Sequence, residues 1–207
     1  MIDLNQVRWI TITYANYQGL KAVPLGLLLT LVSLWANAGT GPRRDFLFPG
    51  ACIVVALLLY WLVSQFYERH YGTVRPTASQ RRSQVLRGVI GGLAGLAAFM
   101  ADITFGLPVS FIGLLFALAS LSEGWWLVRQ ASGRMPAMNI LVAVILGILS
   151  LLPLLGVTWG QMIGFRSRLV AVTAVAGVVF VVTGIYEHIR LTRWLSRPQE
   201  VNHGQRI

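Results

Sequence analysis

Three glutamates stand in similar contexts, each near the carboxyl end of a long apolar run: Phe66-Tyr-Glu68, Leu121-Ser-Glu123 and Ile185-Tyr-Glu187. A carboxylate in the last turn of a helix is disfavoured by the negative end of the helix dipole, so each glutamate is expected to have a cationic partner. An arginine follows each one in sequence, which predicts a cluster of ion pairs. The cluster either gates or docks a partner, or consists of interfacial pairs with snorkelling arginines. Its expected members are Glu68, Arg69, Glu123, Arg129, Glu187 and Arg190.

Two histidines, His70 and His188, adjoin two of these glutamates. With Glu68 and Glu187 they offer the donor types of a metal site, and their protonation near neutral pH offers instead a way to tune the ion pairs. Because no third strong ligand accompanies them, we expect no metal and no cofactor. The sequence also lacks the His-Glu-x-x-His pattern of zinc proteases and a glycine-rich phosphate loop. This inventory favours a protein that is not an enzyme, and the apolar segments lack the midplane acids that coupled transporters use.

Asp102 and a row of glycines lie in the longest apolar stretch, which runs from Gln84 to Arg129. Asp102 is either a functional carboxylate at depth or a turn residue that reaches water or caps the next helix. The glycines recur at three- and four-residue spacing, which predicts close helix packing. We expect their partner to be a helix of the same chain, with a second copy as the alternative, and we expect replacement by leucine to destabilise the bundle. The stripe consists of Gly88, Gly91, Gly92 and Gly95.

The composition indicates a protein of the lipid bilayer. Of 207 residues, 56% are hydrophobic and 12% are charged, about half the charged fraction of soluble domains. The net charge of +10 comes from arginines that separate apolar segments, so anionic lipid headgroups are the expected partner and nucleic acid is not. The single cysteine, Cys52, excludes an internal disulfide.

The apolar segments predict an all-α, polytopic membrane bundle. The stretch from Gln84 to Arg129 is too long for one crossing of roughly 20 residues, so we expect two crossings with a turn at 101–108. This hairpin is expected to be the centre, with two looser hairpins packed around it. The six expected transmembrane helices are 22–38, 46–67, 85–102, 107–128, 137–157 and 169–187, which together form a domain over 22–190.

The two ends of the chain are expected to lie outside this domain. Residues 1–21 show helical spacing of apolar and aromatic side chains, which predicts an amphipathic helix on the membrane surface, the alternative being a frayed terminus. The run after Lys21 also imitates a secretion signal, although we expect it to be retained as the first helix. Residues 191–207 are predicted to be a basic tail.

The placement of basic residues predicts the orientation. With the N-terminus, the second and fourth loops and the C-terminus on one side, that side carries thirteen of the 17 arginines and lysines. The positive-inside rule then puts both termini in the cytoplasm. The protein is thus expected in a bacterial inner membrane.

The pattern of hairpins, the glycines from Gly88 to Gly95, Pro108, Pro153 and the sequence Gly184-Ile-Tyr-Glu187 resembles the HdeD family of small bacterial membrane proteins, over roughly residues 88–194. The resemblance implies six helices and a link with acid stress, and it implies no catalytic residues. We therefore expect a non-enzymatic accessory or stress-related membrane component. The alternatives are the membrane subunit of a transporter or exporter or a small channel, acting as a homodimer or with a partner membrane subunit, and a lipid-modifying enzyme.

Overall fold

The computed structural model describes residues 19–39, 47–71, 78–131 and 137–195, and all of its secondary structure is helical. The predicted surface helix over 1–21 falls outside this part except for its last turn, and residues 196–207 also fall outside it. The elements are η1 (Gly19–Lys21), α2 (Ala22–Ala38), α3 (Leu47–Tyr71), α4 (Ala78–Thr104), α5 (Phe111–Ala131), α6 (Ala137–Leu151), η2 (Leu152–Leu155), α7 (Trp159–Met162) and α8 (Arg168–Leu195).

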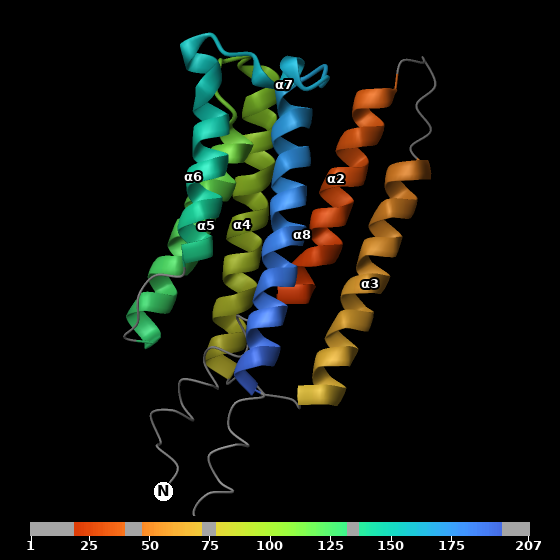
Figure 1. Ribbon diagram of the computed structural model, residues 1–207, viewed down its shortest axis with the longest axis vertical. Helices are drawn as coiled ribbons and strands as arrows, with labels where there is room; N and C mark the ends of the chain where they lie inside the picture. The colour runs from red at the N-terminus through yellow and green to blue at the C-terminus, as the bar shows by residue number, and fades with distance from the viewer. Residues whose placement is uncertain (1–18, 40–46, 72–77, 132–136, 196–207) are drawn as a thin grey trace, which may run out of the picture.

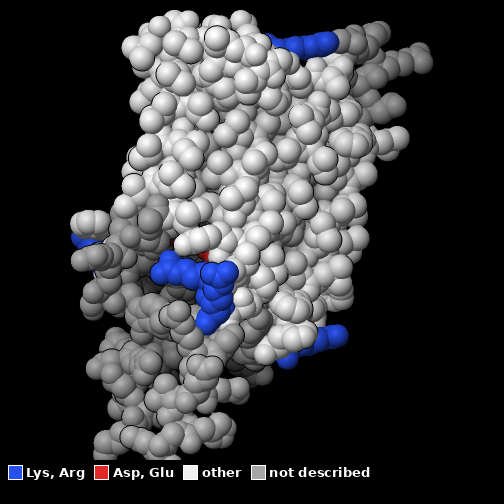
Figure 2. Space-filling model, viewed as in Figure 1, with Lys and Arg blue, Asp and Glu red and all other residues white. Residues whose placement is uncertain are grey.

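Within the described residues, four segments are long and apolar enough to cross a membrane, by length and composition: Gly19–Ala38, Leu47–His70, Met138–Leu155 and Arg168–Arg193. The apolar parts of the other two long helices, Gly88–Thr104 and Phe111–Trp125, are shorter. Large apolar side chains cover the outside of the bundle, and those of α3 are exposed along most of its length. On the face in Figure 2, Lys and Arg gather toward the two ends of the molecule, with a broad uncharged belt between them. Such a belt suits lipid and not water.

The long helices run up and down the bundle, and α8 occupies its centre (Figure 1). It packs against α2, α5 and α6, whereas the main neighbour of α3 is α2 and that of α4 is α5. The prediction that the 84–129 hairpin forms the centre is therefore wrong, because α4 lies on the outside. The reason is the composition of α8, which buries Ala171, Ala174 and Ala176 almost completely and so allows several helices to approach its backbone.

The backbones of α2 and α8 approach each other closely where the two helices cross in antiparallel orientation (Figure 1). Gly26 faces Gly177 so closely that a Cβ added at Gly26 would lie 2.6 Å from the Gly177 carbonyl oxygen. Seven residues away along each of the two segments, Gly19 lies against the backbone of Gly184 in the same way. Side chains do not fit between these backbones, so this glycine pairing fixes how α2 lies along α8.

The predicted glycine stripe has no such partner. A Cβ added at Gly88, Gly91, Gly92 or Gly95 would meet nothing within 4 Å among the described residues. The expected partner helix is therefore not found among the described residues, and packing against another helix of the same chain stays a prediction. The alternative of a second copy is left as a proposal.

Two helices extend well past the predicted boundaries. α5 continues to Ala131 and α8 to Leu195, so Glu123 and Glu187 each lie eight residues before a helix end and not in a last turn. The first five residues of the predicted tail, 191–195, are helical for the same reason. Leu191 is buried against Tyr67 and Leu20, and this contact stabilises the extra turns of α8.

Candidate functional site

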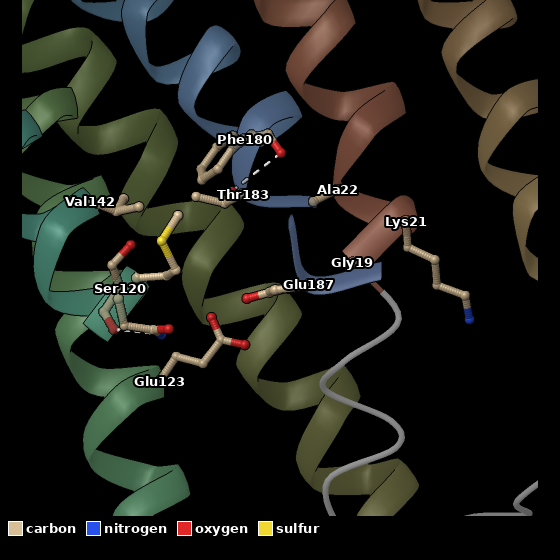
Figure 3. Close-up of a pocket in the computed structure, with 11 residues that line it drawn as sticks. Gly19, Lys21, Ala22, Ser120, Glu123, Val142, Phe180, Thr183 and Glu187 are labelled. Carbon is tan, nitrogen blue, oxygen red and sulfur yellow. Dashed lines mark hydrogen bonds between the residues drawn. The ribbon is translucent and has the colours of Figure 1, made fainter. Parts of the chain in front are cut away.

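A pocket of about 310 Å³ lies at one end of the bundle, between η1, the start of α2, α5, α6 and α8 (Figure 3). Its apolar wall comes from Ala22, Met138, Val142 and Phe180, and its polar wall from Ser120, Asn139, Thr183 and the two glutamates of α5 and α8. The backbone of Gly19 closes one side. The pocket therefore joins five elements, with η1 and the start of α2 lying far in sequence from α5, α6 and α8.

Glu123 and Glu187 point into the same space from neighbouring helices (Figure 3). Glu187 is half-buried, whereas Glu123 is exposed. Each lies eight residues before the end of its helix, about 12 Å from that end at 1.5 Å per residue. Their charges repel each other, and Arg190, one turn further along α8, attracts Glu187. Two acids of the predicted cluster are thus brought together inside the bundle.

The third glutamate of the predicted cluster does not line this pocket. Glu68 acts electrostatically on Lys21, whose ammonium points away from the pocket (Figure 3) and lies 5.9 Å from the centroid of the Tyr60 ring. Arg129 lies over the Trp125 ring, 5.2 Å from its centroid. One shared cluster of three pairs is therefore not what the described residues form, because α3 lies beyond α2 and apart from α5.

The neutral polar groups of the pocket are positioned by bonds to their own surroundings. Asn139 Nδ2 donates to the Ser120 carbonyl oxygen at 3.1 Å, which links α6 to α5. Thr183 Oγ1 donates to the Val179 carbonyl oxygen at 2.8 Å. Because that bond uses the only hydroxyl proton of Thr183, the side chain offers an acceptor to the pocket. Together with the two carboxylates, this makes the lining rich in acceptors.

The inner end of the pocket is closed by packed apolar side chains. Val142 belongs both to the pocket wall and to a layer of buried apolar side chains, whose other members are Ala117, Ala143, Leu146 and Ala176. Phe116 and Phe180 meet edge to face at this level, with ring centroids 5.4 Å apart. The pocket therefore ends there, and in the described residues it does not continue as a polar path to the middle of the bundle.

The two histidines considered as metal ligands have other contacts. His188 Nδ1 lies 3.0 Å from the hydroxyl of Tyr67, which also accepts a bond from the Leu20 N–H at 3.4 Å. His70 Nδ1 lies 3.1 Å from the Phe66 carbonyl oxygen of its own helix. Among the described residues no three His, Cys, Asp or Glu side chains come together as a metal site would need. The metal hypothesis built on these four residues is therefore not supported.

Tyr67 has a role in helix packing that was not predicted from the sequence. It is 1% exposed, on a helix whose other large side chains mostly face outward. Its hydroxyl ties α3 to α8 and to η1 through His188 and Leu20, the residues next in sequence to Glu187 and Gly19 of the pocket lining. The only signal in the sequence was an aromatic next to Glu68, which looks like an interfacial side chain.

Asp102 lies at the opposite end of the bundle and caps α5. Its Oδ1 accepts the N–H of Phe111 at 2.7 Å, and its Oδ2 accepts the N–H of Ile112 at 3.1 Å and the hydroxyl of Ser110 at 3.0 Å. Three donors around one carboxylate satisfy the first amides of a helix, as a side-chain cap does. The capping alternative is therefore the one found.

The same end carries a second connection between distant segments. Asn37 at the end of α2 donates through Nδ2 to the Gly164 carbonyl oxygen at 3.1 Å, and its Oδ1 accepts the Arg166 N–H at 2.8 Å. These two bonds hold the chain between α7 and α8 against α2. This role of Asn37 was not predicted from the sequence.

Fold and site together define a helical protein with four membrane-length apolar helices and a two-carboxylate pocket near one end. Comparison with known proteins finds no matching family model, no matching curated protein and no matching solved structure.

Proposed function

We propose that the chain is a non-enzymatic, multi-pass protein of a bacterial inner membrane, an accessory or stress-related component that crosses the bilayer six times as three hairpins. Its termini lie in the cytoplasm. The lengths of α4 and α5, 27 and 21 residues, support two crossings beyond the four membrane-length helices, since they correspond to roughly 40 and 30 Å of helix. Both helices run beside the other long helices of the bundle (Figure 1), and each contains a shorter apolar segment.

The observation that carries the accessory role is the packed layer above the pocket. A transporter or channel needs polar groups that continue through the bilayer, whereas Ala117, Val142, Leu146 and Ala176 fill that level with apolar atoms. A pocket that ends inside the bundle suits binding at one face of the membrane. This supports a component that senses or docks something over one that conducts it.

The proposed relation to the HdeD family draws on the same region. Gly184 and Glu187, both in the sequence that carries the resemblance, lie on α8 at the α2 crossing and at the pocket. The family's link with acid stress is thus carried over as a proposal for this chain.

The proposed lipid partner is supported by exposed cations at the pocket end. Arg69, Arg82 and Arg129 are exposed, and near a cytoplasmic surface each basic side chain contributes about 1 kcal/mol of attraction to anionic lipid. The exposed glycine face of α4 favours one alternative arrangement, in which a second copy or a partner subunit covers it.

Cysteine labelling tests the topology. In a Cys52→Ser background, Thr40→Cys and Thr104→Cys are expected to react with a membrane-impermeant maleimide on intact cells. Thr73→Cys, Ser132→Cys and Ser196→Cys are expected to react only after permeabilisation. If α4 and α5 do not cross, Thr104→Cys will behave like Thr73→Cys and Ser132→Cys.

Conductance tests the accessory role. The purified chain in planar bilayers is expected to pass no ion current, because the packed layer interrupts the polar path. Steady single-channel currents from the wild type would contradict the proposal and favour the channel alternative.

A further inference from the structure

We propose that the pocket at the end of the bundle binds the primary ammonium group of a small amine. Its lining offers two carboxylates and the acceptor side of Thr183, and the one lysine that contributes to it turns its ammonium away (Figure 3). A ligand for such a lining carries positive charge and N–H donors. The inference rests on the proposed function in one respect, namely that the pocket ends inside the bundle, so that the bound group does not pass through the membrane.

The shape of the pocket selects an organic cation and not a bare metal ion. About 310 Å³ is at the lower end of small-molecule sites and far more than one ion occupies. The wall opposite the acids is apolar, with Met138, Val142 and the ring of Phe180. Short methylene groups fit against these side chains while the ammonium faces Glu123 and Glu187, and the Phe180 ring adds an attraction for positive charge where the cation lies over its face.

The surrounding charge explains why an anion does not fit there. Basic side chains are plentiful at this end, yet Arg190 acts on Glu187 from one turn further along α8, and the Lys21 ammonium lies by the Tyr60 ring. An anionic headgroup meets those cations at the surface. Inside the pocket it would meet two carboxylates, which repel it.

Two sources can supply the ammonium group, a free alkylamine or the ethanolamine headgroup of a phospholipid. Both present three N–H donors on a short carbon chain. The headgroup would enter from the side of the pocket that faces lipid, with its phosphate near the basic rim.

Thermal unfolding of the full chain in detergent, followed by tryptophan fluorescence, tests the proposal with n-butylammonium chloride as the probe. We expect the midpoint to rise with probe concentration in the wild type. In Glu123→Gln/Glu187→Gln the apparent affinity is expected to fall by about tenfold or more, since each lost charged hydrogen bond contributes that much. Glu68→Gln is the matched control, because it removes the same charge at the same end but outside the pocket, and its response is expected to equal the wild type.

Two further measurements keep the proposal falsifiable. Tetramethylammonium chloride at equal concentration has the same charge without N–H donors, and we expect it to bind more weakly. Thr183→Val keeps the side-chain shape, removes one acceptor, and is expected to weaken butylammonium binding severalfold even where the double glutamine variant does not fold. Equal responses of the wild type and the pocket variants, or equal binding of the two cations, would overturn the proposal.

Nanodiscs distinguish the two sources. If the headgroup is the ligand, butylammonium will stabilise the wild type in phosphatidylcholine discs and add little in phosphatidylethanolamine discs, where the site is occupied. If a free amine is the ligand, the response will be the same in both. Failure of the labelling or conductance tests would refute the proposed function without changing these binding results, because binding is measured on the isolated protein.

Discussion

Replacement of Gly177 by alanine tests the central crossing of the bundle. The added Cβ would lie 2.6 Å from the carbonyl oxygen of Gly26 and 2.7 Å from the backbone nitrogen of Thr30. Both are backbone atoms of α2, so the contact is relieved only if the two helices move apart. Forced overpacking of this kind costs about 1–3 kcal/mol, and separation of α2 from α8 also loses contacts along a long antiparallel interface.

An opposing term comes from helix propensity. Alanine in a helix interior is favoured over glycine by about 0.8–1.0 kcal/mol, so these two terms leave a net loss of roughly 0–2 kcal/mol for Gly177→Ala, to which the lost contacts between α2 and α8 add. Gly91→Ala is the matched control, because its Cβ would meet nothing within 4 Å. Only the propensity term applies there, and the variant is expected to be as stable as the wild type or slightly more stable.

Unfolding of both variants in mild detergent with increasing dodecyl sulfate, followed by circular dichroism, gives the comparison. The reasoning predicts opposite signs for the same chemical change at two glycines. A wild-type midpoint for Gly177→Ala, or an equal loss in Gly91→Ala, would refute it. The second result would restore the sequence-based expectation that the α4 stripe is a packing surface of the bundle.

Three other variants test individual contacts, two of them in the same unfolding assay and the third by limited proteolysis. Asp102→Ala is expected to lose about 1–2 kcal/mol, because the cap of α5 is removed, whereas Asp102→Asn should retain most of the stability; equal losses would contradict capping. Tyr67→Phe is expected to lose about 1 kcal/mol with the bond to His188, and Tyr60→Phe, at an exposed position, should lose nothing. Asn37→Ala should make the chain between α7 and α8 more susceptible to limited proteolysis, since two hydrogen bonds that hold it are lost; an unchanged cleavage rate would show that these bonds do not hold it.

The helices were largely predictable from the sequence because apolar runs interrupted by glycine, proline and arginine mark them directly. The range 22–38 matches α2, and 137–157 matches α6 with η2, where Pro153 converts the last turn to a 3-10 helix. The ends were less predictable. Hydropathy identifies only the apolar part of a helix and not its polar extensions. For this reason α4 begins seven residues before its predicted start, and α8 ends eight residues after its predicted end.

The arrangement of the helices could not be read from the sequence. The repeated glutamates suggested equivalent hairpins, and that equivalence placed Glu68 beside Glu123 and Glu187. In the structure α8 is central and α3 packs outside α2, so only two of the three acids meet. Whether two helices pack together depends on the surfaces of both. The residue pattern along one helix therefore does not predict which helix it packs against.

The glycines show this limit most clearly. The glycines of α4 have the three- and four-residue spacing of known packing motifs, yet no described residue lies within 4 Å of a Cβ added there. Gly19 and Gly26 are seven residues apart, as are Gly177 and Gly184, and these four glycines carry the close contact between the two backbones. Close approach requires that glycines on both helices lie opposite each other. Two antiparallel helices with the same spacing of glycines meet this requirement at each pair along the crossing. The same crossing forms the pocket, because Gly19 packs against the Cβ of Glu187 and holds η1 at its edge. The site therefore depends on a helix contact made by residues that have no polar side chain, and the chemistry of Glu123 and Glu187 alone does not reveal it.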